Sequence, residues 1–119
     1  MLKVYNTLTR KKEIFKPLKG KKINFFVCGL TPYDYAHVGH AKTYVQFDLI
    51  VKYLRFLKYE VFYLQNVTNI DDKIIERAKE KKSDPLHLSA QYEKEFKKDM
   101  DSIYVNSVNK YARATDYIK

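Results

Sequence analysis

The fold of this chain is decided by residues 22–41, which read KINFFVCGLTPYDYAHVGHA. The first seven of them form a short apolar run between Gly20 and Gly29, and such a bounded run is typical of a buried strand. After the loop that follows, residues 41–57 place apolar side chains at helical spacing on one side and polar side chains on the other. The stretch therefore predicts a strand over residues 22–28, a connecting loop and an amphipathic helix.

A second buried strand is predicted directly after this helix. Residues 61–67 read VFYLQNV, and their length and apolar content match those of the first strand. A strand, a helix and a strand in this order usually form a right-handed parallel crossover. The sequence thus predicts an α/β fold built on a parallel sheet.

The remaining segments are predicted to flank that sheet. Residues 4–9 and 13–18 indicate two short strands around a basic turn at residues 9–12, which together form an N-terminal β-hairpin. Asp71 and Asp72 precede a segment that ends with several lysines, and acids at the start with bases at the end complement the dipole of a helix. We therefore expect a short helix there.

A longer helix is predicted from Pro85 onward, because Ser83 and Asp84 offer a capping side chain and a proline suits the first turn. Apolar residues then recur at helical spacing at Leu88, Tyr92, Phe96, Met100 and Ile103. From Asn106 onward the periodicity is lost, and no closing element is predicted.

Composition limits the class of protein. Of the 119 residues, 45% are apolar and 31% are charged, so we expect residues 1–119 to form a single globular domain. No run approaches the ~20 apolar residues of a membrane-spanning helix, the start lacks a secretion signal, and a lone Cys28 cannot form an internal disulfide. These features predict a cytoplasmic protein without a membrane partner. The formal charge of +9 favours nucleotides or RNA as partners, although lysines that only solubilise a surface explain it equally well.

The connecting loop carries the candidate site. In an open parallel sheet, ligands bind beyond the carboxyl ends of the strands, where a helix amino terminus offers unpaired N–H groups to phosphate. His37 and His40 flank the predicted terminus and can donate to one phosphate, while Gly39 removes a side chain that would keep a nucleotide from the backbone. Taken alone, two histidines near a helix start are more often a cap and a surface residue.

Several blocks of sequence point together to one family. Around the loop they are CGLT at residues 28–31, Tyr33-Asp34, and HVGH at residues 37–40. Farther away they are VYNTLTR at 4–10, QNVTNIDDK at 65–73 and RAT at 113–115. In this order they closely resemble the cysteinyl-tRNA synthetases, a group of class I aminoacyl-tRNA synthetases, and the resemblance covers essentially the whole chain.

The resemblance implies a partial Rossmann-type sheet that forms the amino-terminal half of a catalytic, nucleotide-binding domain. The implied enzyme is a cysteine–tRNA ligase, which joins L-cysteine to ATP as an adenylate, with Mg²⁺ accompanying ATP, and then transfers cysteine to tRNA(Cys). His37 and His40 are the implied catalytic residues, because positioned donors stabilise the charge that builds on the α-phosphate. The implied ATP-binding residues are Thr31, His37, Gly39, His40 and Thr43, and the implied substrate-binding residues are Gly29, Thr31, Asn66 and Thr68.

The resemblance also implies a zinc ion. Cys28 matches one zinc ligand of the family, and a soft cation selects the thiolate of cysteine over the hydroxyl of serine. Without the resemblance, Cys28 at a strand end is more simply interpreted as a small apolar residue packed near the sheet. The other zinc ligands, the lysine-rich second signature and the anticodon-binding helices have no counterpart in this sequence. We therefore expect the chain, as a monomer, to bind ATP weakly and not to aminoacylate by itself.

Alternatives and departures remain at this point. Residues 31–34 (TPYD) also resemble the cysteine ligase of mycothiol biosynthesis, although the block at residues 6–10 favours the tRNA enzyme. The length of the chain also allows a non-catalytic nucleotide-binding module or one subunit of a split enzyme. Asn69 stands where the family generally has aspartate, which removes a negative charge near the crevice. His87, in the first turn of a charged helix, is predicted to be a surface residue.

Overall fold

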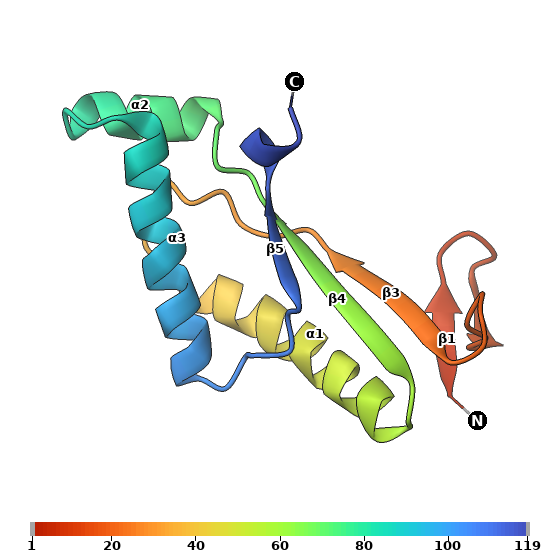
Figure 1. Cartoon of the computed structure of the whole chain (residues 1–119). Helices are drawn as coiled ribbons and strands as arrows, with labels where there is room; N and C mark the ends of the chain where they lie inside the picture. Colours follow the sequence, from red (N-terminus) through yellow and green to blue (C-terminus); the bar gives the residue numbers. More distant parts are fainter. Residues whose placement is uncertain (1, 119) are drawn as a thin grey trace.

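A computed structural model describes residues 2–118 of the chain (Figure 1). Its central element is a parallel sheet in the order β3-β4-β5, formed by β3 (Lys22–Val27), β4 (Glu60–Val67) and β5 (Lys110–Arg113). Between these strands the chain forms the helices α1 (Val38–Phe56), α2 (Asp72–Glu80) and α3 (Pro85–Ser102). The predicted α/β fold with a parallel sheet and flanking helices is confirmed.

Helices α1 and α3 cover one face of the sheet (Figure 1). Alternate residues of β4 point toward these helices and are buried, because side chains of a strand alternate between its two faces. The helices contribute five large side chains to this core: Tyr44, Val51, Leu54, Phe96 and Met100. Each fully buried apolar side chain contributes ~1.5–3 kcal/mol to stability, so this layer holds the fold together. Among residues 2–118 no helix combines the length and the apolar character needed to cross a bilayer.

Among residues 2–118, no helix covers the opposite face of the sheet (Figure 1). Phe26 of β3 and Phe62 of β4 lie on it with 61% and 48% of their surface exposed. Parallel sheets in proteins normally have both faces covered. This face therefore exposes more apolar surface than is usual for a small domain. The molecule is also extended, with a radius of gyration of 16.7 Å, where a compact chain of this length would have ~13.5 Å.

The ends of the helices follow local capping chemistry. Asp71 accepts a hydrogen bond from the N–H of Lys73 at 2.9 Å, and Asp84 accepts one from the N–H of His87 at 2.9 Å, so each acid starts its helix as predicted. Helix α1 begins at Val38, three residues before the predicted start at residue 41, because His37 acts as its N-cap.

The prediction that no element follows Asn106 is wrong, because β5 pairs in parallel with β4 and completes the sheet. Long-range polar contacts place it. The buried carboxylate of Asp48 in α1 accepts the N–H groups of Asn106 and Ser107 at 3.0 and 2.8 Å. Arg55, also in α1, donates to the Ser107 carbonyl at 3.0 Å and to the Asn109 side chain at 2.7 Å. These contacts hold the segment that leads into β5 against α1.

The predicted β-hairpin is present, but its predicted bounds are wrong. It consists of β1 (Lys3–Asn6) and β2 (Lys11–Ile14), which pair antiparallel as a sheet separate from β3-β4-β5 (Figure 1). The turn occupies residues 7–10, where Arg10 adopts a φ of 56°. The chain thus reverses before the two lysines that the prediction placed in the turn, and residues 15–18 lie outside any strand.

Candidate active site

The two histidines form a reciprocal cap at the amino terminus of α1. Nδ1 of His37 accepts the N–H of Gly39 at 3.1 Å, and Nδ1 of His40 accepts the N–H of His37 at 3.2 Å. Their ring centroids lie 4.0 Å apart. Both histidines therefore act as helix caps, because they satisfy N–H groups that a helix end leaves unpaired. Capping is part of the simpler interpretation, in which the two histidines are a cap and a surface residue.

This cap determines which ring nitrogen faces outward. A neutral imidazole carries one hydrogen, and an Nδ1 that accepts a hydrogen bond cannot carry it. In both rings the hydrogen therefore belongs to Nε2, which remains available as a donor. Burial, followed by the proximity of His37, lowers the pKa of His40 below its usual value of 6.5, which favours this neutral form.

Gly39 makes room for the ring of His37 in the helix cap, in addition to the room that it was predicted to leave for a ligand. A Cβ atom at this position would lie 2.8 Å from Cε1 and 2.9 Å from Nδ1 of His37. A side chain there would push the ring out of its position over the first turn. Thr43, the other predicted ATP contact in this helix, is exposed and donates to the Gly39 carbonyl at 3.0 Å.

The stability of the chain should depend on pH through His40. Because its folded-state pKa lies below 6.5, the folded chain binds fewer protons than the unfolded chain between those two pKa values. We expect the free energy of unfolding to be highest above this range and to fall as the pH drops through the folded-state pKa. Urea unfolding between pH 5 and 7.5 measures this.

The matched control for this prediction is His40→Gln. Glutamine suits the same position of a capping box but does not titrate, so the cap is kept while one titrating group is removed. The pH dependence of stability should become shallower in this variant. An unchanged slope would show that His40 does not contribute to it.

The predicted substrate-binding residues meet where β3 and β4 end. The N–H of Gly29 donates to Oδ1 of Asn66 at 2.8 Å, and Nδ2 of Asn66 donates to the hydroxyl of Thr68 at 3.3 Å. The N–H of Thr68 in turn donates to the Leu30 carbonyl at 3.0 Å. A Cβ atom on Gly29 would lie 1.7 Å from the Asn66 carbonyl oxygen, so only glycine allows the two chains this close approach. Thr31, the remaining predicted substrate contact, lies two residues after Gly29 in the loop that follows β3, and it is half-buried.

Cys28 is an exposed free thiol directly after β3, so the interpretation of it as a packed apolar residue is wrong. Its carbonyl accepts a hydrogen bond of 3.5 Å from the hydroxyl of Tyr44 in α1. Burial of Tyr44, with Cys28 as a further neighbour, raises the pKa of that hydroxyl to about 12, so it remains a donor. Within residues 2–118, no three His, Cys, Asp or Glu side chains gather as a metal site, and Cys28 supplies a single thiol ligand.

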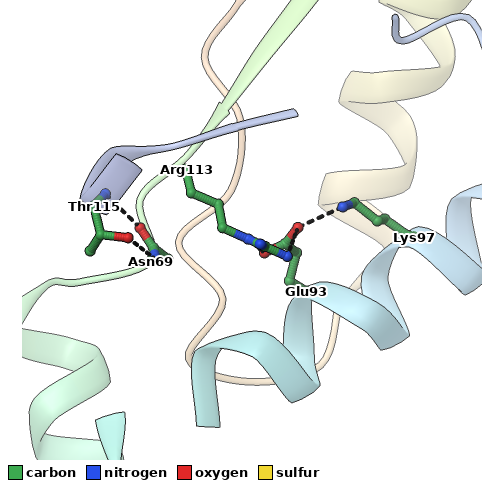
Figure 2. Close-up of polar contacts among 5 residues, drawn as sticks. All are labelled: Asn69, Glu93, Lys97, Arg113 and Thr115. Carbon is green, nitrogen blue, oxygen red and sulfur yellow. Dashed lines mark hydrogen bonds and ion pairs between the residues drawn. The ribbon is translucent and has the colours of Figure 1, made fainter. Parts of the chain in front are cut away.

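The structure adds polar contacts that the sequence did not reveal. Arg77 of α2 forms an ion pair of 2.7 Å with Asp34, which ties the connecting loop to α2. Glu93 of α3 is 2% exposed and binds Nε of Arg113 at 2.7 Å and Lys97 at 2.6 Å (Figure 2). Of these residues, Asp34 and Arg113 lie in family-like blocks, and neither block indicated its partner. His87 is exposed, as predicted.

Asn69 has a structural role that the sequence did not indicate. Its side chain is 7% exposed, and it pairs with Thr115 beyond the end of β5 (Figure 2). The amide is therefore a structural link between the ends of β4 and β5.

Comparison with known proteins agrees with the resemblance. Residues 14–119 match the family model described as the catalytic domain of tRNA synthetases class I (C). A cysteine–tRNA ligase from Pyrococcus furiosus is 50% identical over 118 residues, which are 99% of this chain and 25% of that protein. The chloroplastic/mitochondrial cysteine–tRNA ligase of Arabidopsis thaliana is 46% identical over 115 residues, which are 97% of this chain and 20% of that protein.

A solved structure shows the same fold. A methionyl-tRNA synthetase from Mycobacterium tuberculosis, in complex with methionyl-adenylate, has a TM-score of 0.71 at 22% identity, over 79% of this chain and 19% of that chain. The prediction of a Rossmann-type fold is thereby confirmed. The chain spans about a quarter or less of the length of the relatives described above.

Proposed function

The chain belongs to the family of class I (C) tRNA synthetase catalytic domains, and from that membership we propose that it provides the nucleotide-binding part of a cysteine–tRNA ligase. In this proposal residues 1–119 are one domain, the amino-terminal half of the catalytic domain, which acts as a monomer in the cytoplasm. Relatives named cysteine–tRNA ligase at 46–50% identity favour this function over the cysteine ligase of mycothiol biosynthesis.

The proposed reaction begins with adenylation. A carboxylate oxygen of L-cysteine attacks the α-phosphorus of ATP, the bond from that phosphorus to the bridging oxygen breaks, and pyrophosphate leaves with Mg²⁺. Negative charge builds on the α-phosphate oxygens during the attack. Fixed hydrogen-bond donors stabilise that charge without needing to rearrange, which lowers the barrier.

The observation that carries this proposal is the direction of the two imidazoles. Because each Nδ1 of His37 and His40 accepts a backbone N–H, each Nε2–H is a preorganised donor at a helix amino terminus. The α1 dipole adds a partial positive charge at the same place. The amino-acid part of the substrate would lie beside Gly29, Asn66 and Thr68, whose mutual hydrogen bonds fix the neighbouring strand ends.

A zinc ion is part of the proposal for the complete enzyme. The exposed thiol of Cys28 suits one ligand position. A tetrahedral site takes about four ligands, so the remaining donors would come from outside the described residues. The bound ion would accept the thiolate of the substrate and disfavour serine.

ATP binding tests the role of His40 directly. Glutamine and glutamate both suit the capping position, but glutamate has no donor and presents a negative charge to phosphate. We expect His40→Glu to weaken ATP binding about 10- to 100-fold in calorimetric titration of the purified chain, and His40→Gln to weaken it much less. Equal ATP affinity in the wild-type protein and the His40→Glu variant would show that the residue is only a cap.

A second candidate is a nucleotide-binding subunit of a split enzyme, and the uncovered apolar face at Phe26 and Phe62 favours it. Exchange of labelled pyrophosphate into ATP, measured with and without cysteine, tests whether the chain needs groups from outside itself for adenylation. The chain alone should bind ATP without cysteine-dependent exchange if the remaining groups come from another polypeptide or a longer chain. Robust exchange by the purified chain would contradict that expectation.

A further inference from the structure

Positive charge is concentrated at the start of the chain. Residues 1–22 contain eight Lys and Arg residues and a single acid, Glu13, whereas residues 23–119 contain fifteen Lys and Arg residues and thirteen acids. All eight of these basic residues are exposed, and within residues 2–118 none of them forms an ion pair. A surface that only needs to be soluble intersperses both signs of charge. Residues 1–22 therefore form a patch whose positive potential attracts anions.

The patch contains a groove at the point where the chain enters β3. Its volume is about 390 Å³, which lies within the ~300–1,000 Å³ range of small-ligand sites. The apolar side chains that line it include Phe15, Leu18 and Ile23. Its basic side chains are Lys16, Lys19 and Lys22, and none of the lining residues is acidic. The groove thus combines apolar walls with three cations.

The groove is held in shape by contacts of its own residues. The N–H of Phe15 donates to the Leu2 carbonyl at 2.9 Å, and the ring of Phe15 packs edge-on against Tyr59 with the centroids 5.9 Å apart. On the other side, the N–H of Lys22 donates to the Lys19 carbonyl at 3.0 Å, which closes a tight turn. A site that is formed before its ligand arrives loses less entropy when it binds.

Lys19 and Lys22 are direct neighbours across this turn. They form an antiparallel bridge, and both residues are exposed. Like charges on directly opposed residues destabilise a folded chain, so the stability of the fold does not explain this pair. Glu60 lies opposite Lys22 in the register of β4, but within residues 2–118 the two form no ion pair. The two lysines therefore remain available to an anionic ligand.

The groove is separate from the candidate active site. It lies at the amino end of β3, whereas the candidate site and the short helix η1 (Ala114–Asp116) lie at the carboxyl edge of the sheet (Figure 1). Strand β3 has six residues, so these two ends are ~20 Å apart. A chain of nucleotides carries a phosphate at every link and can extend from one end to the other.

We propose that this groove binds RNA, with an unpaired base against its apolar side chains and the neighbouring phosphates on its three lysines. A positive groove combined with a side chain that can stack on a base is the arrangement by which proteins bind single-stranded nucleic acid. The inference rests on the proposed function, in which tRNA(Cys) is a substrate, and it assigns part of the RNA contact to this end of the chain.

A double substitution tests the two neighbouring lysines. The probe is a fluorescein-labelled transcript of tRNA(Cys), titrated by fluorescence anisotropy between about 50 and 200 mM KCl. Lys19→Gln with Lys22→Gln should weaken binding roughly 10- to 50-fold near 100 mM KCl and make the salt dependence shallower by about 1.5 units of slope. Thermal unfolding should show this variant at least as stable as the wild type, because two like charges no longer face each other.

The matched control removes the same charge from another surface. Lys79 of α2 and Lys94 of α3 are exposed, and within residues 2–118 neither forms an ion pair. Lys79→Gln with Lys94→Gln should leave the slope unchanged and weaken binding by less than about threefold, because released counterions come only from phosphates that the protein contacts.

The apolar part of the groove needs a separate test. Leu18 is fully exposed in the free chain, so Leu18→Asn leaves the core intact. We expect this variant to bind an oligouridylate, which has unpaired bases, about threefold more weakly with an unchanged salt slope. Leu8, in the hairpin turn, is also exposed and does not line the groove. Leu8→Asn should therefore bind the oligouridylate like the wild type.

Each outcome decides the question. Equal losses in the two lysine double variants would overturn the groove, because net charge would be responsible. Wild-type affinity of Lys19→Gln with Lys22→Gln for tRNA(Cys) would also overturn it and would leave the groove to a protein segment. A wild-type chain that binds ATP in calorimetric titration but neither RNA would refute this inference and leave the nucleotide site standing. Binding of RNA without binding of ATP would refute the proposed nucleotide site and leave the groove standing.

Discussion

Replacing Gly29 with alanine should lower the free energy of unfolding by about 3–4 kcal/mol, which is above the ~1–3 kcal/mol typical of overpacking. The added Cβ would lie 1.7 Å from the carbonyl oxygen of Asn66 and 2.9 Å from its carbonyl carbon. Both atoms belong to the backbone of β4, which cannot rotate away as a side chain can. The strand ends would have to separate, and the bond of 2.8 Å from the Gly29 N–H to the Asn66 side chain would be lost.

Urea unfolding of Gly29→Ala measures this loss, and two other glycines provide matched controls. A Cβ on Gly20 meets nothing within 4 Å, so Gly20→Ala suffers only from its φ of 56° and should lose ~1–2 kcal/mol. A Cβ on Gly39 meets only the movable ring of His37, so Gly39→Ala should lose about 1 kcal/mol from the disturbed cap. Stability losses of similar size at all three glycines would contradict the close approach of β3 and β4.

The second large effect is expected for Glu93→Ala, which should lower the free energy of unfolding by about 2–3 kcal/mol. Removing a buried carboxylate commonly has a larger effect when its partners are buried too. Here the side chains of Arg113 and Lys97 are 48% and 37% exposed, so water can replace part of what they lose. Hydrogen–deuterium exchange should increase at β5 and η1, because Arg113 would no longer anchor them to α3.

The exposed pair of Glu95 and Lys98 on the same helix supplies the control. Their charged groups lie 3.9 Å apart with side chains 40% and 78% exposed, so Glu95→Ala should change stability by less than about 0.5 kcal/mol. Burial opposes ionisation of Glu93, but hydrogen bonds from Arg113 and Lys97 outweigh it and hold its pKa below the usual range. The stabilisation by Glu93 is therefore present above the unfolded-state pKa and is lost as the pH falls through the folded-state pKa. A variant with wild-type stability at pH 7 would contradict the anchoring role.

Local patterns predicted the elements on which the site is built. The apolar runs at residues 22–28 and 61–67 and the helical spacing at 41–57 correspond to β3, β4 and α1. A period of two or of 3.6 is expressed within a few residues of sequence, so it is visible before folding. The start of α1 was placed too late, because a histidine is an uncommon N-cap and its role became visible only in the contacts of Nδ1.

Part of the candidate site was predictable for the same reason. The predicted residues Gly29, Asn66 and Thr68 do meet, because parallel strands place their carboxyl ends at one edge of a sheet. Their roles in binding, and the role of Cys28 toward zinc, remain predictions. The sequence pattern did not predict in which direction the hydrogen-bond donors of His37 and His40 point. That direction depends on which of their ring atoms accept hydrogen bonds in the folded chain.

The sequence by itself determined the α/β class, the parallel pair of strands and the family to which the chain belongs. Only the tertiary structure decided that KYAR at 110–113 is a strand and that Asn69 and Thr115, 46 positions apart, form a pair. Polar side chains such as Asp48 and Glu93 hold distant segments in place through hydrogen bonds. Such bonds have no periodicity along the chain, and they exist only after apolar burial has brought their partners within reach.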